Sequence, residues 1–432
     1  MATPVVATSS VHLVENTLFF VLLQLIVIIV IARVAGQVAR KMGQPRAVGE
    51  MVAGLILGPS LFGHFFPEIS EFLFHSVSPL PISIISQIGL ILLMFQIGMS
   101  FDFSHLTDQK NRRAVSWISV TSIALPFALG FGLGQWSAPY LASGIAPMPY
   151  SLFVGIAFSI TAVPILGRIM AEFGLTQTHV GAIAISAAAV NDVVGWLLLA
   201  VISALSLAQF SLVNTLAQLG LLAIYVAVCW LVVRPLLRRL INRSDLTQNR
   251  LPGDLMAAIL AVTFISSIAT FKIGIFAIFG GFMMGVLVHD MPEFVALWKK
   301  SVGDFVMVFF LPIFFTYTGL RTNIAGLDTS SLWTWCLIFI LGAMVGKLGG
   351  AYFGARMAGL DKYQSSTIGI LMNTRALMEL IVLNIGYDLG FIPRNVFTML
   401  VVMAIATTIM TGPALRNMLP KMGHRIPVGI DA

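Results

Sequence analysis

The chain has 432 residues, of which 58% are hydrophobic and only 10% are charged, with a formal net charge of +7. A soluble domain carries about 25% charged residues, so the composition excludes an ordinary soluble protein and predicts a polytopic membrane protein. The two cysteines, Cys229 and Cys336, lie in apolar runs without a CxxC motif or a neighbouring histidine. We therefore expect no disulfide framework, no cysteine metal site and no cofactor.

Apolar runs long enough to cross about 30 Å of hydrocarbon follow one another along the whole chain. The segment before the first run lacks the basic start of a signal peptide, so we expect this run to remain as a span. We predict an all-α protein with about 13 transmembrane helices, at residues 17–35, 46–62, 82–99, 114–136, 149–171, 180–206, 212–240, 254–271, 273–290, 301–321, 331–357, 364–388 and 394–418.

Positive charge is distributed unevenly between alternate loops. If the loop after the first span is cytoplasmic, that side collects twenty of the 25 Lys and Arg residues, and the other side only Lys272, Arg321 and Arg394. The two that remain, Lys347 and Arg375, lie deep inside predicted spans. The positive-inside rule then places the N-terminus outside and the C-terminus in the cytoplasm, and the net charge reflects topology and contact with lipid, with no nucleic-acid partner implied.

The fifth span contains Ser159, Thr161 and Pro164. Proline removes a backbone donor and disturbs the preceding turn, and broken helices of this kind line the substrate cavity in transporters. Taken alone, a simple proline kink explains the same sequence. The sixth span carries Asn191 and Asp192 in an otherwise uncharged run, about 18 Å from its start and so near the middle of the membrane.

A carboxylate at that depth costs at least about 2.5 kcal/mol on insertion scales, so Asp192 is interpreted as an ion or proton site. The alternative for Asn191 and Asp192 is a purely structural role, in which their polar side chains hold neighbouring helices together. Three more deep polar groups lie in the twelfth span, where Arg375 and Glu379 are spaced to pair on one face and Asn373 precedes them. That pair is interpreted equally well as structural or functional.

Lys347, in the eleventh span, could neutralise Asp192 when no ion is bound. The fifth and twelfth spans both look interrupted and are seven spans apart, which inverts their orientation. We therefore predict one transmembrane domain over 1–432, with an inverted repeat at 1–211 and 241–432, a linker helix at 212–240 and two broken crossing helices. No soluble regulatory domain is expected.

Several of these segments together resemble the monovalent cation:proton antiporter-2 family, in particular the membrane part of plant cation/H+ exchangers and of Kef-type bacterial proteins. The segments are Gly49–Pro59, Ala157–Arg168, Ala184–Asp192, Thr318–Arg321 and Asn373–Gly386. The resemblance covers essentially the whole chain. It implies an Na+/H+ antiporter-like fold, a homodimer in a bacterial inner membrane, and a core domain that moves against a dimer-forming domain.

The resemblance further implies that Asp192 binds the cation and the proton in turn. The Asn-Asp pair is similar to that of electroneutral exchangers, which implies exchange of one Na+ or K+ for one H+, with a role in pH homeostasis. Two departures limit this inference: Lys347 resembles the core lysine of electrogenic relatives, and Ala376 stands where relatives often have glycine. The stoichiometry and the choice between Na+ and K+ therefore stay open.

The residues themselves suggest the same mechanism. Burial favours the protonated carboxyl of Asp192 and a nearby cation favours the charged form, so proton and cation would compete for one group. Asn191 and Thr161 would supply neutral oxygen ligands for a hard cation. A Kef-like potassium efflux pathway or a cation channel is the alternative function, although no filter motif is present. All seven histidines lie near span ends or in loops, so we expect no enzyme.

Overall fold

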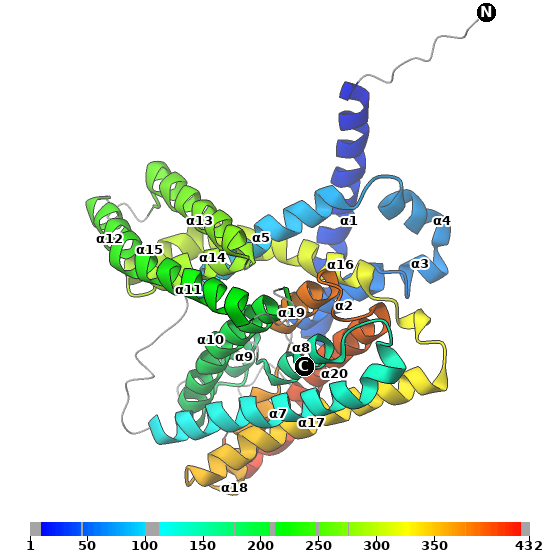
Figure 1. Cartoon of the computed structure of the whole chain (residues 1–432), viewed down its shortest axis with the longest axis vertical. Helices are drawn as coiled ribbons and strands as arrows, with labels where there is room; N and C mark the ends of the chain where they lie inside the picture. Colours follow the sequence, from blue (N-terminus) through cyan, green and yellow to red (C-terminus); the bar gives the residue numbers. More distant parts are fainter. Residues whose placement is uncertain are drawn as a thin grey trace, which may run out of the picture.

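The computed structural model describes residues 10–424, apart from residues 45, 100–111, 162, 177, 208–211, 245, 247–249, 275 and 376. All secondary structure in this part of the chain is helical, as predicted (Figure 1). The helices before residue 210 are α1 (Ser10–Lys41), α2 (Arg46–Leu57), α3 (Phe62–Phe65), α4 (Pro67–Ser70), η1 (Glu71–His75), α5 (Leu80–Met99), α7 (Arg112–Leu141), α8 (Pro147–Ser159), α9 (Val163–Glu172) and α10 (His179–Leu207).

The second half of the chain continues in the same way. Its helices are α11 (Leu212–Val228), η2 (Cys229–Val233), α12 (Arg234–Arg243), α13 (Gly253–Ile273), α14 (Ala277–Leu287), α15 (Pro292–Trp298), η3 (Lys299–Gly303), η4 (Val306–Phe310), α16 (Leu311–Arg321), η5 (Ile324–Gly326), α17 (Ser330–Met357), α18 (Lys362–Met372), α19 (Leu377–Asp388), α20 (Arg394–Met418) and η6 (Leu419–Met422).

Helices coincide with every predicted span, but not all of them are long enough to cross a membrane unaided. Among the described residues, nine helices are long and apolar enough, or up to 11 if each of two bent pairs forms one span. The bends are 43° between α15–η3 and η4–α16, and 44° between α18 and α19. The predicted ninth span contains only α14, of 11 residues. The number thirteen therefore stays a prediction.

The structure separates the eighth and ninth predicted spans, 254–271 and 273–290, close to the expected boundary. α13 ends at Ile273, and Gly274 follows with φ of 89°, a left-handed conformation that caps a helix and favours glycine. The backbone N–H of Gly274 bonds to the carbonyls of Phe271 and Thr270, which satisfies the end of α13. α14 then begins at Ala277.

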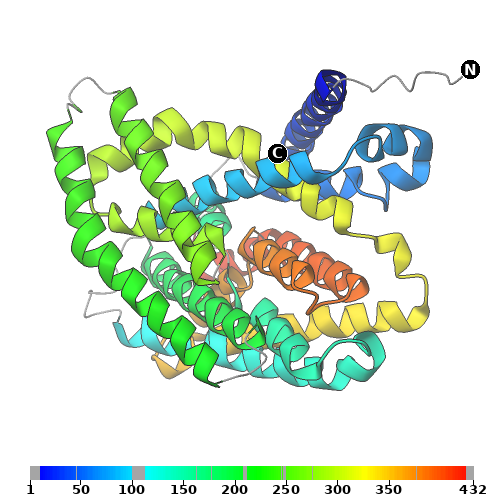
Figure 2. The ribbon, with the colours of Figure 1, turned by 45° about the horizontal axis from the view of Figure 1, so that its top comes forward.

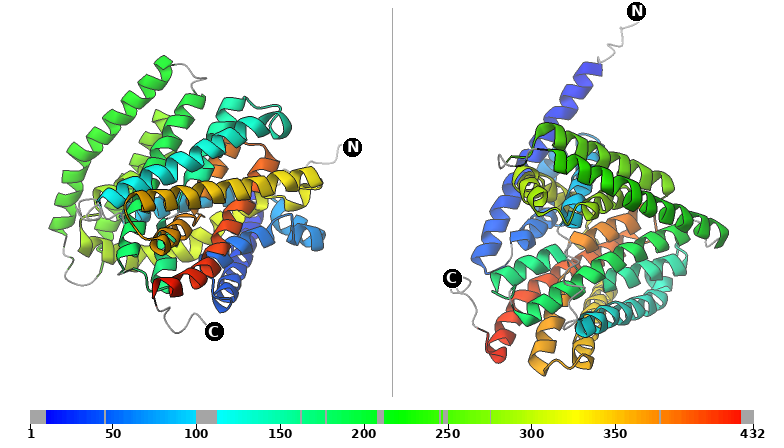
Figure 3. Two further views of the ribbon diagram at one scale, coloured as in Figure 1. Left: turned by 90° about the horizontal axis from the view of Figure 1, so that it is seen from below. Right: turned by 90° about the vertical axis from the view of Figure 1, so that its left-hand side faces the viewer.

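The helices form two groups. α1, α2, α5 and α16 share a buried apolar cluster that includes Val21, Leu57, Ile82 and Ile313, and α13 and α14 pack against α5. The other group contains α7, α8, α17, α18 and α20, with α7 and α17 running side by side along its edge (Figures 1 and 2). In the further views of Figure 3, the N-terminal end of α1 projects away from both groups.

Small residues set the spacing between α7 and α17. A Cβ atom at Gly350 would lie 2.5 Å from the carbonyl oxygen of Thr121, so only glycine permits this approach. Close contact through small residues is a common way for helices to associate in a membrane. The two interrupted helices pack against this α7–α17 pair, α8 mainly against α7 and α18 mainly against α17.

Both predicted interruptions are present. α8 ends at Ser159 and α9 begins at Val163, with Ile160 and Thr161 outside either helix. Pro164, in the first turn of α9, favours this break because it has no N–H to donate to the carbonyl of Ile160. The second break, between α18 and α19, occurs without a proline.

Candidate ion-binding site

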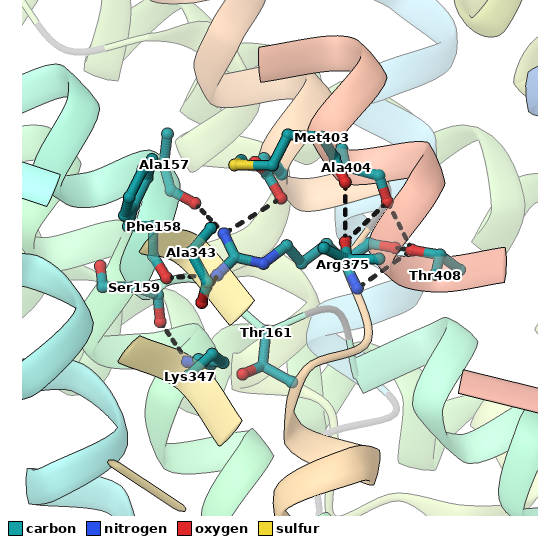
Figure 4. A network of polar contacts seen from close by, with 12 residues as sticks. Ala157, Phe158, Ser159, Thr161, Ala343, Lys347, Arg375, Met403, Ala404 and Thr408 are labelled. Carbon is teal, nitrogen blue, oxygen red and sulfur yellow. Dashed lines mark hydrogen bonds and ion pairs between the residues drawn. The ribbon is translucent and has the colours of Figure 1, made fainter. Parts of the chain in front are cut away.

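The two interruptions meet in the interior of the second group of helices (Figure 4). The hydroxyl of Thr161, in the first break, donates a hydrogen bond of 3.1 Å to the carbonyl of Met372, the last residue of α18. Arg375, in the second break, reaches back to the end of α8. Four half-helices therefore end around one buried region, which places helix termini and unwound backbone at the centre of the bundle.

Arg375 closes the broken end of α8. Its Nη1 atom donates to the carbonyl of Ala157 at 2.6 Å and its Nη2 atom to the carbonyl of Phe158 at 2.8 Å, with a further bond of 3.1 Å to Ala343 on α17. The last carbonyls of a helix have no partner within it and carry partial negative charge. A fully buried guanidinium supplies both the donors and the opposite charge.

The second break is held by α20. Thr408 accepts a hydrogen bond of 3.2 Å from the backbone N–H of Arg375, and its hydroxyl also contacts the carbonyl of Arg375. A threonine side chain thus replaces the helical hydrogen bonds that Arg375 lacks. As predicted, Arg375 also pairs with Glu379, at 3.7 Å between Nη1 and Oε2, and both side chains are fully buried.

Lys347 completes the capping of α8. Its ammonium group donates to the carbonyl of Ser159 and, at 2.9 Å, to the carbonyl of Ser122 on α7. Lys347 interacts electrostatically with Asp192, whose carboxylate oxygens accept no hydrogen bond from the described residues. The expectation that Lys347 neutralises Asp192 when no ion is bound stays a prediction.

Asp192 is fully buried in α10, and neither of its carboxylate oxygens has a hydrogen-bond partner among the described residues. The backbone N–H of Val163, at the first residue of α9, lies close enough for an electrostatic interaction without meeting hydrogen-bond geometry. A helix N-terminus beside a carboxylate stabilises its charged form. That partial compensation leaves the oxygens available to another partner.

Further unpartnered oxygens belong to the same region. Asn191 donates from Nδ2 to the hydroxyl of Ser122 at 2.9 Å, which leaves its Oδ1 atom without a partner in the described part of the chain. The Oδ1 atom of Asn373 and the Oγ1 atom of Thr374, in the second break, are also buried and unpartnered there. Such atoms are costly to bury dry, and carboxylate, amide and hydroxyl oxygens are the ligands that hard cations prefer.

The other predicted residues have supporting positions. Ser159 bonds through its hydroxyl to Ile156 within α8, and its carbonyl accepts from Lys347. Pro164 lies in the first turn of α9, but its side chain is outside the described part of the structure, as is all of Ala376.

Sequence reasoning missed Ser122 and Thr408, which hold Asn191 and Arg375 in place. Both are hydroxyl residues in apolar spans, and Ser122 lies one turn before Pro126. Isolated serines and threonines are common in membrane helices, so this signal was weak. It becomes informative only when the partner helix is known.

The whole sequence has relatives among known transporters. Residues 26–421 match the family model described as sodium/hydrogen exchanger, transmembrane. The Na+/H+ antiporter NhaS4 of Synechocystis sp. is 36% identical over 416 residues, which cover 95% of this chain and 99% of the relative. Cation/H+ antiporter 17 of Arabidopsis thaliana is also 36% identical, over 92% of this chain but only 48% of its own length.

A more distant relative is named for a different cation. The K+/H+ antiporter 1 of Saccharomyces cerevisiae is 29% identical over 386 residues, which cover 88% of this chain and 44% of the yeast protein. Among solved structures, the sodium proton antiporter MjNhaP1 of Methanocaldococcus jannaschii superposes with a TM-score of 0.66 at 16% identity, covering 92% of this chain and 97% of that one. This likeness shows a shared antiporter fold.

Proposed function

Because this chain belongs to the transmembrane sodium/hydrogen exchanger family and is a cation/proton antiporter, we propose that Asp192 is the group at which cation and proton replace each other. The observation that carries the proposal is a fully buried carboxylate, beside two crossing helix breaks, whose two oxygens have no hydrogen-bond partner among the described residues. An ionised carboxylate is costly in such a place, so it calls for a proton or a cation as partner.

The cation would be held by buried oxygen atoms that accept no hydrogen bond from the described residues. Asp192 supplies the negative charge, and Asn191 and Thr161 supply neutral oxygens, with Asn373 at the second break. The hydroxyl of Thr161 donates to Met372, so its lone pairs stay available. Na+ and K+ are the candidate substrates, since relatives are named for both.

Arg375, Glu379, Lys347, Ser159 and Pro164 would support the site without holding the ion. The carboxylate of Asp192 can bind either a cation or a proton, but not both at once. This competition couples the transport of the cation to that of the proton. Alternating access would come from movement of the group containing α7, α8, α17, α18 and α20 against the group containing α1, α2, α5 and α16.

We propose electroneutral exchange of one cation for one proton. The support is the position of Lys347, whose donors bond to the carbonyls of Ser122 and Ser159 and so hold α8 instead of pairing with Asp192. In this proposal Lys347 keeps its proton through the cycle, because the two carbonyls that accept its hydrogen bonds favour the charged ammonium group. Only Asp192 then changes its charge when one ion replaces the other.

We propose the finer assignments of membrane, orientation, repeats and oligomeric state as follows. The chain acts as a transporter and not an enzyme, in a bacterial inner membrane, with its N-terminus outside and its arginine-rich loops in the cytoplasm. Residues 1–211 and 241–432 form the inverted repeats, and 212–240 links them. α1 exposes an apolar row that includes Leu18, Leu22 and Ile26, which supports a homodimer formed through this helix.

The test is cation-dependent proton flux in proteoliposomes with an imposed pH gradient, comparing Li+, Na+, K+ and Rb+. The wild-type chain exchanges Na+ or K+ for protons, and Asp192→Asn does not. Asp254→Asn is the matched control, because Asp254 lies exposed in the first turn of α13 and keeps wild-type flux. Flux through Asp192→Asn at the wild-type rate would exclude the proposal, and unsaturable cation flux without proton counterflow would favour a channel.

A further inference from the structure

Two cavities share Tyr317, near the C-terminal end of α16, as a lining residue. The larger, of about 870 Å³, is lined by residues between α2 and α5 and by Arg321 and Arg394. The smaller, of about 210 Å³, is lined by residues of α5, α13, α14, α16 and α19. Tyr317 therefore lies at the boundary between the two cavities.

Arg321 links α16 to α19 at this boundary. Its Nη1 atom donates to Asp388 at 2.6 Å and to the amide oxygen of Asn384 at 3.3 Å. Its Nη2 atom bonds to the hydroxyl of Tyr317, and the guanidinium lies 4.1 Å from the centre of that ring. A carboxylate, an amide oxygen and a hydroxyl therefore surround one positive charge, which is a ligand set that also suits a small hard cation.

The smaller cavity continues this polar path inward. Ser86 and Asn384 both line it, and both are buried. The Oγ atom of Ser86 has no hydrogen-bond partner among the described residues, although its side chain is fully buried. Glu379 lies about 7.5 Å deeper along α19 than Asn384, at 1.5 Å per residue. On α19 the cavity is lined from Asp388 to Ile381, which is two residues from Glu379.

We propose that Asp388, Asn384 and Ser86 form a second binding site for the transported monovalent cation, and that Arg321 closes it as a tethered cation. We call these three residues the outer station; the inference rests on the proposed exchange at Asp192. The ion pair is 22% exposed at Arg321 and 44% exposed at Asp388, so water can replace its two partners when they separate. An arriving cation can take the place of the guanidinium, which has the larger cavity to move into.

The charges predict opposite effects for the two members of the pair. Asp388 raises the local concentration of cations at the boundary, whereas Arg321 competes with them for the same oxygens. Asp388→Asn should therefore raise the apparent KM for the cation on this face, and Arg321→Gln should lower it. A pair that serves only as a structural link would give the same sign for both variants.

The experiment compares sided transport in right-side-out and inverted membrane vesicles, with Na+ or K+, whichever the wild-type chain exchanges faster. In right-side-out vesicles Asp388→Asn raises the apparent KM by at least about threefold and Arg321→Gln lowers it, while inverted vesicles show wild-type values. Arg394→Gln removes another positive charge that lines the larger cavity and leaves both values unchanged. Asp388→Glu, which keeps the charge, restores the wild-type KM.

Equal shifts on both faces, shifts of one sign for Asp388→Asn and Arg321→Gln, or no shift in either variant would each overturn the outer station. The parent proposal fails by a different result, namely continued exchange in Asp192→Asn. The proposed function predicts that Asp192→Asn shows no exchange in either kind of vesicle. The same vesicle preparations therefore distinguish a failure of the outer station from a failure of the proposed function.

Discussion

Arg375 and Lys347 bind consecutive carbonyls at the same helix end: Arg375 takes those of Ala157 and Phe158, and Lys347 takes that of Ser159. Since the carbonyl of Ile156 already bonds to the N–H of Ile160, the end of α8 is fully satisfied. Two buried cations thus permit a helix to stop in the middle of the protein. These two side chains stabilise the break beside Asp192 by satisfying the carbonyls that it leaves open.

Removal of Arg375 should destabilise the protein strongly. Arg375→Leu leaves Glu379 as a buried, unpaired charge and exposes the α8 carbonyls, at an expected cost of about 3–5 kcal/mol. Glu379→Leu should be costly for the reciprocal reason, and the double variant should lose less stability than the sum of the two. Unfolding of the four proteins in detergent measures this cycle, and additive losses would show that the pair is uncoupled.

Lys347 should matter for stability and not for the charge carried per cycle. Lys347→Met removes two hydrogen bonds from a charged donor, each worth about 1.5–3 kcal/mol, so Tm should fall clearly. Exchange by the wild-type protein and by any folded Lys347→Met protein should be indifferent to an imposed membrane potential. A wild-type flux that follows the potential, and a variant flux that does not, would instead assign charge transfer to Lys347.

Close contact between α2 and α16 requires glycine at position 319. A Cβ atom there would lie 1.9 Å from the carbonyl oxygen of Gly54, so Gly319→Ala should cost about 1–3 kcal/mol through overpacking. Gly132, on α7, has no atom within 4 Å of an added Cβ, and Gly132→Ala should be neutral or stabilising. Thermal unfolding of both variants checks this prediction, and equal effects would contradict it.

Asp290 should stabilise the turn after α14 in a pH-dependent manner. Partial burial raises the pKa of Asp290, but the hydrogen bond from Arg234 and the charges of Arg238 and Arg234 outweigh it and hold the pKa below the ordinary 3.8. A lowered folded-state pKa contributes stability above the ordinary value and loses it as pH falls through the lowered one.

Asp290→Asn should therefore lower the free energy of unfolding by roughly 1 kcal/mol or less above about pH 5, since the pair is partly exposed. The gap in Tm between the wild type and Asp290→Asn should close as pH falls below the ordinary pKa. Glu293→Gln, an exposed neighbour, should leave Tm unchanged throughout. A gap of constant size across the pH series would contradict the ionic interpretation.

The sequence was informative where one residue determines the local structure. Pro164 predicts the first break through its missing N–H, and Asp192 is conspicuous because no other charge lies in its span. The roles of Lys347, Ser122 and Thr408 were not predictable, because each bonds to a helix or break distant in sequence: Lys347 and Thr408 to backbone groups, and Ser122 to the side chain of Asn191. Backbone carbonyls are present at every position, so nothing in the sequence marks the three that α8 leaves open.

The central claim is that one carboxylate, Asp192, binds the cation and the proton in turn. The most direct measurement is the exchange rate of the wild-type chain in proteoliposomes as a function of cation concentration at several pH values. Competition at one group predicts that the apparent KM for the cation rises as pH falls, while the maximal rate stays constant. A maximal rate that falls with pH at constant KM would mean that proton and cation occupy separate groups, and would contradict the claim.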